Sequence, residues 1–434
     1  MRRKGASNAL AGALLVVGLL VGAGLTYALT STSTSSTSST TTSSGALSGT
    51  ITIGDLTDLS GQLSAIGTQQ KQAVDLAVGD INNYLTTLGI TSYKFAANDQ
   101  DTSLQPAKAL TDLQTLASSG VQVVVGPLTS AEASNVLQTA NQDHIVLISA
   151  SSTAISLAIP NDYLFRLVPN DAAQSLAIAR ELVTQNVKDI IVINQNSVYG
   201  AGLANATINR YKALGGNVQD QIQYSTTVTD FTPTLTTAQS DYTAAVGKYG
   251  AGSVAVVCIG FQEVGQMLLQ TKSSFPGLLQ TTWYGSDGES QNTDFTNSTG
   301  GVGPVSAQIK LISTIGENPA ATDKYNNFVK EFTAVAKQAP DSYAVGAYDA
   351  TWVAALSIMA AGKNSGQAIQ ASLPAVANNY FGAVGWTELQ PSGDMAPTGY
   401  SIYEVTSSGG TDQWVLAGTW DAGTDAVTWQ PGMP

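Results

Sequence analysis

The chain has 434 residues, enough for two domain-sized cores, and its 43% apolar residues and 42 glycines are typical of a globular protein. Only 11% of the residues are charged, and the formal net charge is −13. Nucleic acids are bound by clustered Lys and Arg, and the chain has no such cluster beyond Arg2, Arg3 and Lys4, so the composition argues against a nucleic-acid partner.

The N-terminus has the pattern of a membrane anchor. The apolar stretch Ala9–Leu29 follows the basic residues; as a helix rising about 1.5 Å per residue, it is long enough to span the hydrocarbon core of a bilayer, which is roughly 30 Å thick. The basic end is expected to stay in the cytoplasm. A cleaved secretory signal is the alternative, but its apolar region is shorter, about 7–15 residues. The Lys4-Gly5-Ala6 junction resembles the pilin-like signals of archaeal surface binding proteins, which implies cleavage between Gly5 and Ala6 with the apolar helix retained. Residues 1–29 are therefore predicted to be a signal and transmembrane anchor.

A polar linker follows the anchor. Every residue from Thr30 to Ser44 is Ser or Thr, a composition that cannot bury a core and predicts a flexible linker over residues 30–48. Asn205-Ala-Thr and Asn297-Ser-Thr are N-glycosylation sequons, which fit a head outside the cell. We expect a cell-surface protein whose head is tethered to the cytoplasmic membrane by the N-terminal helix.

From Thr50 onward, short β-rich runs alternate with helical patterns. Apolar residues at Ala73, Leu76, Ala77 and Ile81 recur with the period of one helical face. Such alternation predicts right-handed crossovers and a parallel sheet covered by helices on both faces. The first series has predicted strands at Ile51–Leu56, Tyr93–Asn98, Val121–Gly126 and Ile145–Ile148, and predicted helices at Gln69–Leu88, Pro106–Ser118 and Ala131–Asn141.

The pattern begins again near Asp171. This second series has predicted helices at Asp171–Gln185, Leu203–Leu214 and Phe261–Lys272, and predicted strands at Asp189–Asn194, Val218–Tyr224 and Ser253–Ile259. The fold class is therefore predicted to be α/β, with two doubly wound parallel-sheet lobes. Ligands of such sheets bind beyond the carboxyl ends of the strands, so the polar residues that follow each strand are candidate site residues.

Two of these strand ends belong to the first series. In Val125-Gly-Pro-Leu-Thr-Ser-Ala-Glu, Thr129 and Glu132 have the spacing of a capping box, and Ser130 lies in the first helical turn. Either the motif only caps a helix, or the free N–H groups and the Ser130 hydroxyl bind a ligand carboxylate. Ile148-Ser-Ala-Ser-Ser-Thr153 is either a turn or a source of hydroxyls and carbonyls for an anion or an ammonium group.

Two more candidates follow strands of the second series. Tyr199, in Asn194-Gln-Asn-Ser-Val-Tyr-Gly, lies where a strand gives way to a helix; it either packs in the core or closes over a bound molecule. Asp287, in Trp283-Tyr-Gly-Ser-Asp-Gly, either forms a turn or pairs with a cation in a cleft that has few other charges.

Catalytic and metal-binding residues are scarce. The single cysteine, Cys258, lies in an apolar run and is expected to be buried, and the single histidine, His144, precedes a predicted strand. One Cys and one His cannot build a Cys- or His-based metal cluster, and no Gly-x-Ser-x-Gly motif occurs. We therefore expect no metal, no cofactor and no catalytic residues, and predict a binding protein that is not an enzyme.

The order and spacing of these motifs resemble the leucine/isoleucine/valine-binding proteins of ABC importers, which are type I periplasmic binding proteins. The resemblance covers about Thr50 to Pro434. Its main carriers are Ser60-Gly-Gln-Leu-Ser-Ala-Ile-Gly67, Asn98-Asp-Gln-Asp, Val125-Gly-Pro-Leu-Thr-Ser130, Ile148-Ser…Thr153, Tyr199-Gly-Ala-Gly-Leu203, Tyr284-Gly-Ser-Asp287-Gly and Tyr343…Tyr348-Asp-Ala350.

The resemblance implies a role for each matching residue. Ser130 falls where the family binds the α-carboxylate of an amino acid, and Thr153, with the backbone near Ser151, serves the carboxylate and the amino group. Asp287 takes the place of a Glu that pairs with the α-ammonium and is one methylene shorter. The walls of the pocket are expected to come from four further positions: Tyr199, Tyr343, Ile66, which replaces an aromatic residue, and Phe261, near which the family has a tyrosine.

The resemblance also implies an organisation and a function. One lobe is expected to comprise residues 49–170 and 314–388, and the other residues 171–313 and 389–434, with a hinge of three crossing segments. The implied function is that of an extracellular solute-binding protein, which captures a branched-chain or other apolar amino acid in the cleft between the lobes and delivers it to an ABC permease. The alternatives are an amide, a urea-like molecule or an aromatic acid as ligand, or a ligand-sensing role at the cell surface.

Overall fold

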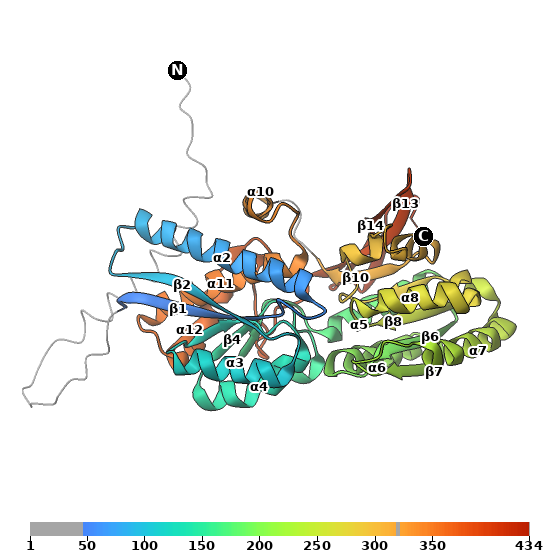
Figure 1. Ribbon diagram of the computed structural model, residues 1–434, viewed down its shortest axis with the longest axis horizontal. Coiled ribbons are helices and arrows are strands. Elements are labelled where there is room, and N and C mark those ends of the chain that lie inside the picture. Colours follow the sequence, from blue (N-terminus) through green and yellow to red (C-terminus); the bar gives the residue numbers. More distant parts are fainter. Residues whose placement is uncertain (1–46, 318–321, 434) are drawn as a thin grey trace, which may run out of the picture.

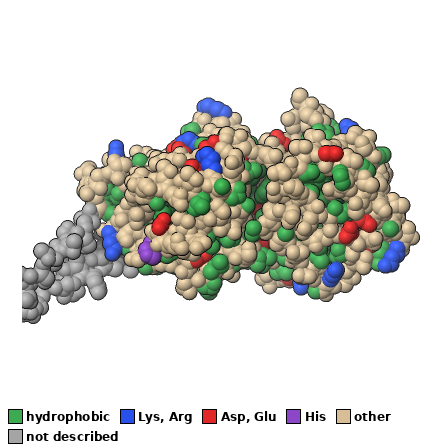
Figure 2. Space-filling model, turned by 60° about the horizontal axis from the view of Figure 1, so that its bottom comes forward, with side chains coloured by type: hydrophobic (Ala, Val, Ile, Leu, Met, Phe, Trp, Pro, Cys, Tyr) green, Lys and Arg blue, Asp and Glu red, His purple; other side chains and the backbone are tan. Residues whose placement is uncertain are grey.

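The computed structural model describes residues 47–317 and 322–433. Figure 1 shows two lobes side by side, each built around one β-sheet. The predicted anchor, the junction at Gly5 and Ala6, and the linker up to residue 46 lie outside the described residues. On the face shown in Figure 2, the few Lys, Arg, Asp and Glu side chains are scattered among neutral ones.

The first lobe contains a five-stranded parallel sheet with the strand order β2-β1-β3-β4-β5. Alternate residues of its strands point to opposite faces, so Val123 and Val125 join one core cluster while Val124 joins the other. Helices α2, α11, α12 and α10 contribute to the first cluster, and α3 and α4 to the second. The elements are β1 (Gly49–Thr57), α2 (Ser64–Thr87), β2 (Tyr93–Asp101), α3 (Pro106–Ser118), β3 (Val123–Val125), α4 (Ser130–Asp143), β4 (Val146–Ser149), η1 (Ile155–Leu157), β5 (Leu164–Arg166), α10 (Asp323–Ala336), α11 (Ser342–Ala361), α12 (Gly366–Ala377), β11 (Phe381–Gly382) and β12 (Gly385–Trp386).

The second lobe contains an eight-stranded sheet with the order β15-β14-β13-β10-β9-β8-β6-β7. Ile190 and Val192 face α5 and α6, while Ile191 and Ile193 face α7, α8 and α9. Cys258 is buried in the core cluster that contains Ile191 and Ile193, as its apolar surroundings in the sequence predict. The elements are α5 (Asp171–Thr184), β6 (Asp189–Gln195), α6 (Val198–Ala213), β7 (Asn217–Tyr224), α7 (Thr232–Tyr249), η2 (Ala251–Ser253), β8 (Val254–Ile259), α8 (Glu263–Ser274), η3 (Pro276–Gln280), β9 (Trp283–Gly285), η4 (Thr293–Thr296), α9 (Val302–Gln308), β10 (Ile312–Gly316), β13 (Gly399–Ser408), β14 (Thr411–Asp421) and β15 (Ala426–Trp429).

The predicted strands and helices of both series are confirmed, with α3 at the predicted bounds and the others shifted by a few residues at their ends. The predicted parallel sheets are confirmed for the first lobe and for strands β6 to β10 of the second lobe, whose sheet has further strands that were not predicted. Strands β13, β14 and β15 extend its sheet in antiparallel fashion beyond β10. A two-residue hairpin at Gly409 and Gly410, both at positive φ, returns β14 along β13.

The chain passes between the lobes three times. It leaves the first lobe between Arg166 and Asp171, returns between Gly316 and Asp323, and crosses again between Trp386 and Gly399. At the first and third crossings, Gly393–Met395 runs beside the edge of β5, where Arg166 N donates to Gly393 O and Met395 N donates to Arg166 O.

Among the described residues, one helix is long and apolar enough to cross a membrane. It is α11, two thirds of which is buried, and it packs against α2 and α12 in the first lobe. Its position is that of a core helix, and the predicted N-terminal anchor lies outside the described part of the chain.

Candidate ligand-binding site

All eight predicted ligand-binding residues lie around one cavity between the two lobes. From the first lobe come Ile66 in α2, Ser130 at the start of α4, Ser151 and Thr153 after β4, and Tyr343 in α11; from the second come Tyr199 in α6, Phe261 before α8 and Asp287 after β9. Leu63, Leu128, Thr129 and Gly288 complete the lining. The structure therefore brings together residues that are more than 200 positions apart in the sequence.

Two loops of the first lobe form a hydroxyl-rich wall. The predicted capping box is present at the start of α4, where Glu132 N donates to Thr129 Oγ1 and Thr129 N donates to Glu132 Oε2. Ser130 Oγ accepts hydrogen bonds from Ser152 Oγ at 3.0 Å and from the backbone N–H groups of Thr153 and Ala154 at 3.2 and 3.1 Å. Because Ser130 only accepts in these contacts, its hydroxyl proton is left to donate to a ligand.

The loop after β4 is fixed to the loop after β3 by further hydroxyl contacts. Ser149 Oγ donates to Pro127 O at 2.7 Å, and Ser151 Oγ donates to Leu128 O at 2.6 Å. Thr153 Oγ1 is buried and has no hydrogen-bond partner among the described residues. Thr153 thus adds a second hydroxyl to the wall that Ser130 begins.

The second lobe supplies a carboxylate on the opposite wall. Asp287 is 6% exposed, and its Oδ1 lies 2.6 Å from Tyr199 Oη. The ring of Tyr199 stacks on Phe261, with the ring centroids 5.1 Å apart. Glu289 holds the surrounding backbone by accepting hydrogen bonds from Gly260 N and Ser286 N at 2.8 Å each.

Tyr343 contacts Asp287 directly across the cleft. Its hydroxyl donates to Asp287 Oδ2 at 2.8 Å, which joins α11 of the first lobe to the loop after β9 of the second. The space that remains between the walls is only about 20 Å³, close to the minimum of about 10–15 Å³ for a single water. The lobes are therefore closed on each other in this structure, and a larger molecule can enter only if they separate.

A second buried carboxylate, Asp171, interacts electrostatically with Asp287, and no motif in the sequence singled it out. Burial, and next the charge of Asp287, raise the pKa of Asp171 well above its usual range. Burial also raises the pKa of Asp287, although Tyr199 and Tyr343 offset part of that rise by donating hydrogen bonds. Asp171 lies beside the loop that carries Thr153, since its backbone N–H donates to Thr153 O at 2.9 Å. The sequence pattern predicted only the start of a helix at Asp171; in the structure Asn170 caps that helix, accepting from Ala172 N.

The charges of the site are thus arranged asymmetrically. Asp287 offers negative charge to a cation from the second lobe, whereas the first lobe offers two hydroxyls, that of Thr153 and that of Ser130 at the N-terminus of α4, the positive end of that helix. This arrangement can hold a small molecule with an ammonium group at one end and a carboxylate close to it. Among the described residues, no group of three or more His, Cys, Asp or Glu side chains could hold a metal ion.

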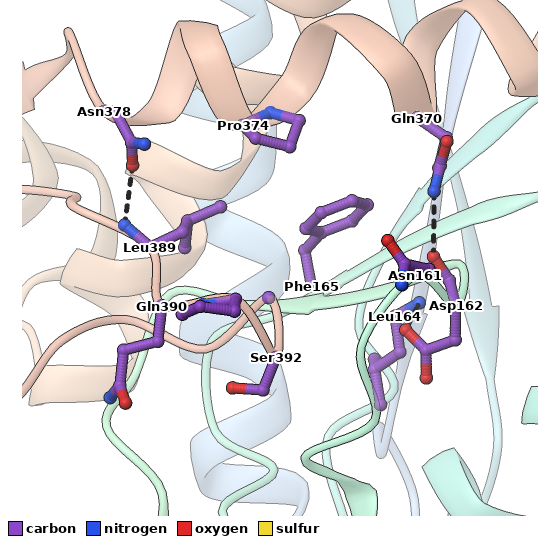
Figure 3. A pocket seen from close by; sticks show the side chains of 12 residues that line it. Asn161, Asp162, Leu164, Phe165, Gln370, Pro374, Asn378, Leu389, Gln390 and Ser392 are labelled. Carbon is purple, nitrogen blue, oxygen red and sulfur yellow. Dashed lines mark hydrogen bonds between the residues drawn. The ribbon is translucent and has the colours of Figure 1, made fainter.

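A larger hollow lies away from these residues, as Figure 3 shows. It has a volume of about 290 Å³ and lies between β5, the C-terminal half of α12 and the third crossing segment. Its polar lining is mostly amides, such as Gln370 and Gln390, and its one acidic side chain is Asp162, whose pKa burial raises to about 6. None of the predicted site residues lines it.

The two sequons lie on the surface of the second lobe. Asn205 is exposed on α6, and Asn297 is exposed after η4.

Comparison with known proteins agrees with this architecture. Residues 50–411 match the model of a family described as periplasmic binding protein. The chain is 31% identical over 398 residues to an uncharacterized protein of Methanocaldococcus jannaschii, covering 88% of this chain and 92% of that protein. It is 26% identical over 364 residues to Leu/Ile/Val-binding protein homolog 3 of Brucella melitensis, covering 82% and 91% of the two chains.

A solved structure shares the fold. The leucine-binding protein LivK of Thermotoga maritima superposes with a TM-score of 0.72 at 19% sequence identity, covering 88% of this chain and 99% of that one. The chain has two α/β lobes, a cleft lined from both of them and a family match over most of its length. It therefore belongs to the periplasmic binding proteins and has their type I fold, that of solute-binding proteins.

Proposed function

We propose that this protein captures a free amino acid with an apolar side chain between its lobes and delivers it to an ABC permease. The observation that carries the proposal is the pair of opposed walls, hydroxyls of Ser130 and Thr153 on one lobe and the Asp287 carboxylate on the other. A relative named as a Leu/Ile/Val-binding protein homolog supports the same class of ligand.

The two ends of the ligand would be bound by different lobes. Asp287, with Asp171 behind it, would pair with the α-ammonium, and Ser130 and Thr153 would donate to the α-carboxylate. Burying an ammonium or a carboxylate costs several kcal/mol per ion unless each is paired, so both walls are needed at once. Ile66, Leu63 and Leu128 line the cavity near the hydroxyl wall, and Phe261 lies on the other side. These apolar groups favour an apolar side chain on the ligand.

Lobe closure would couple binding to delivery. We propose a first lobe of residues 49–170 and 314–388 and a second lobe of residues 171–313 and 389–434, with the three crossing segments as the hinge. A ligand that touches both walls contacts them fully only when the lobes are closed, and this differential affinity shifts the population toward the closed form. A permease would recognise the closed form.

Calorimetric titration of the purified full-length chain tests the proposal. Carried-over ligand is first removed by unfolding and refolding, and the protein is then titrated with the twenty amino acids. We expect saturable one-to-one binding of leucine, isoleucine or valine that Asp287→Ala abolishes. Asp230→Asn is the matched control: Asp230 is an exposed acid of the same lobe that accepts from Thr232 N, a bond that Asn can keep.

The alternatives predict other outcomes. Binding of a simple amide, urea or an aromatic acid, with no response to amino acids, would keep the fold and overturn the ligand. Binding of an amino acid that Asp287→Ala leaves unchanged would contradict the assigned ammonium site. A protein that binds the amino acid but gives no uptake when reconstituted with candidate permeases would fit a sensing role at the cell surface.

A further inference from the structure

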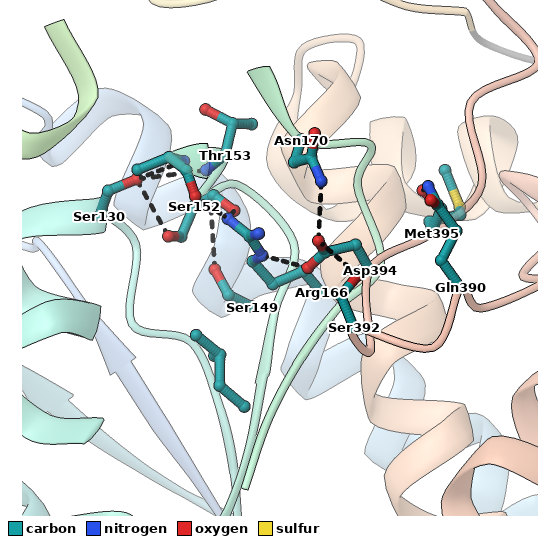
Figure 4. Close-up of polar contacts among 12 residues, drawn as sticks. Ser130, Ser149, Ser152, Thr153, Arg166, Asn170, Gln390, Ser392, Asp394 and Met395 are labelled. Atoms are coloured by element: carbon teal, nitrogen blue, oxygen red, sulfur yellow. Dashed lines mark hydrogen bonds and ion pairs between the residues drawn. The ribbon is translucent and has the colours of Figure 1, made fainter. Parts of the chain in front are cut away.

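Arg166 lies between the ligand-binding loop and two of the three crossing segments. It is the last residue of β5, and its side chain is completely buried, as is that of its partner Asp394. Asp394 belongs to the third crossing segment, 228 residues further along the chain. Figure 4 shows the contacts of both residues together with Ser130, Ser152 and Thr153.

The guanidinium group binds three acceptors at once. Nε donates to Asp394 Oδ1 at 2.5 Å, while Nη1 donates to the carbonyl oxygens of Ser152 at 3.1 Å and Ala154 at 2.8 Å. These two carbonyls flank Thr153, a candidate ligand-binding residue. The backbone N–H groups of Thr153 and Ala154 donate to Ser130 Oγ on the other side of the loop, so the loop is held from both sides.

Asp394 in turn is tied to the first crossing. Its Oδ2 accepts from Asn170 Nδ2 at 2.8 Å and from Ser392 Oγ at 2.9 Å. Asn170 is the N-cap of α5, the helix that begins with Asp171. A single chain of contacts, buried at Arg166 and partly buried at Asn170, therefore runs from the hydroxyl wall, through Arg166 and Asp394, to the segments that connect the lobes (Figure 4).

We infer that Arg166 is a positioning residue for ligand binding, which sets the conformation of the Ser149–Ala154 loop and couples it to the crossing segments. The expected effect of Arg166 on ligand affinity rests on the proposed function, whereas its expected effect on the loop does not. The planar guanidinium can serve an acidic side chain and two carbonyls in fixed directions, whereas a lysine ammonium has one compact head and cannot reach all three in this geometry. Arg166→Lys keeps the charge but loses the simultaneous contacts.

The test combines hydrogen exchange with ligand titration on the full-length chain. In Arg166→Lys, the amides of Thr153 and Ala154 are expected to exchange at least about tenfold faster than in the wild type, and the affinity for L-leucine is expected to fall at least about tenfold. The control is Arg180→Lys; Arg180 pairs with Asp425 in the second lobe, away from the crossings, and both measurements should stay at wild-type values.

Asp394→Asn is a second variant that keeps the shape of the acid but removes its charge. It is expected to speed exchange of the same two amides, because the guanidinium loses its ionic anchor, while amides in the core of the second lobe, such as Val256 and Val257, stay protected. Unchanged exchange at Thr153 and Ala154 in both variants would overturn the inference, as would an equal rise throughout both lobes, which indicates a purely structural role. If the wild type binds no leucine, the proposed ligand fails, while the exchange rates still decide the role of Arg166.

Discussion

The hydroxyl of Tyr343 in α11 donates to Oδ2 of Asp287 across the cleft at 2.8 Å, and both side chains are buried. This contact occupies the carboxylate that is proposed to receive the ligand's ammonium. Tyr343 therefore serves as the internal partner of Asp287 in the closed structure, and a ligand must replace this bond or share the carboxylate.

The first prediction concerns this contact. Tyr343→Phe removes the hydroxyl and leaves the ring, so the closed form of the ligand-free protein loses a hydrogen bond to a charged group, a contact worth about 1.5–3 kcal/mol. We expect a larger radius of gyration for the variant in small-angle X-ray scattering. Tyr348→Phe is the matched control, since Tyr348 lies in the same helix and donates to Asp80 at 2.8 Å within one lobe. Equal radii for the wild type and Tyr343→Phe would show that the contact does not contribute to closure.

The second prediction is that ligand binding releases a proton. Burial raises the pKa of Asp287, and burial together with the Asp287 charge raises the pKa of Asp171 well above its usual range. The ligand-free pair therefore keeps a proton at pH values above those at which carboxyl groups usually titrate. An ammonium group favours the ionised pair. The complex therefore binds fewer protons than the free protein, and the affinity should rise with pH.

Calorimetry in buffers with different ionisation enthalpies measures this release. We expect a buffer-dependent binding enthalpy for the wild type that corresponds to at most about one proton per ligand. Asp171→Asn should remove most of the dependence, because its amide does not titrate. A wild-type enthalpy that is the same in all buffers would contradict the coupling of the two carboxylates.

Part of the candidate site could be predicted from strand ends alone, whereas Ile66, Phe261 and Tyr343 were implied only by the family resemblance. Ser130, Thr153 and Asp287 each sit in a short polar motif just beyond a strand, and the carboxyl ends of parallel strands meet at one edge of a sheet. Asp171 could not be found in this way. It occupies the first turn of a helix, and only the tertiary fold of the second lobe brings it close to Asp287, which lies 116 residues further along the chain.

The fold was less predictable where local signals were weak. Helix α7 begins with four threonines within six residues, a composition with poor helix propensity. It is held instead by the burial of Leu235, Ala238 and Tyr242 along one face. In α11, buried residues occur all round the helix, so no amphipathic period marks it. The β13–β14 hairpin is marked in the sequence by Gly409-Gly410, a dipeptide typical of two-residue hairpin turns.

The third prediction concerns Asp55, which is fully buried in β1. Its Oδ1 accepts from Gln70 at 2.7 Å, its Oδ2 has no partner among the described residues, and burial raises its pKa from 3.8 to about 8. Between these values the folded state binds one more proton than the unfolded state. Stability should therefore fall as pH rises from about 4 to about 8, by up to about 1.4 kcal/mol per pH unit.

Asp55→Asn removes this titration and can keep the bond from Gln70. We expect the urea midpoint of the variant to exceed that of the wild type at pH 8, with the difference shrinking or reversing at pH 5. Asp143→Asn, at an exposed acid near the end of α4, is the control and should show no such pH dependence. A shift of equal size at both pH values would contradict a raised pKa for Asp55.

The last prediction concerns the turn that delivers Ser130 to the site. Gly126 has a φ of +104°, and a Cβ at this position would collide with the carbonyl oxygen of Leu56 in the neighbouring strand β1. Gly126→Ala is therefore expected to lower the free energy of unfolding by about 1–3 kcal/mol because of backbone strain. The clash adds to this loss, and it can be relieved only by moving the loop before α4. Because Ser130 follows this loop, the affinity for the amino acid should fall as well.

Gly79→Ala is the matched control for Gly126→Ala. Gly79 is exposed inside α2, and a Cβ there meets no atom within 4 Å, so the change should stabilise the protein by about 0.5–1 kcal/mol. Urea unfolding and calorimetric titration of the two variants separate the effects. A Gly126→Ala variant with wild-type stability and affinity would mean that the loop adapts without moving Ser130.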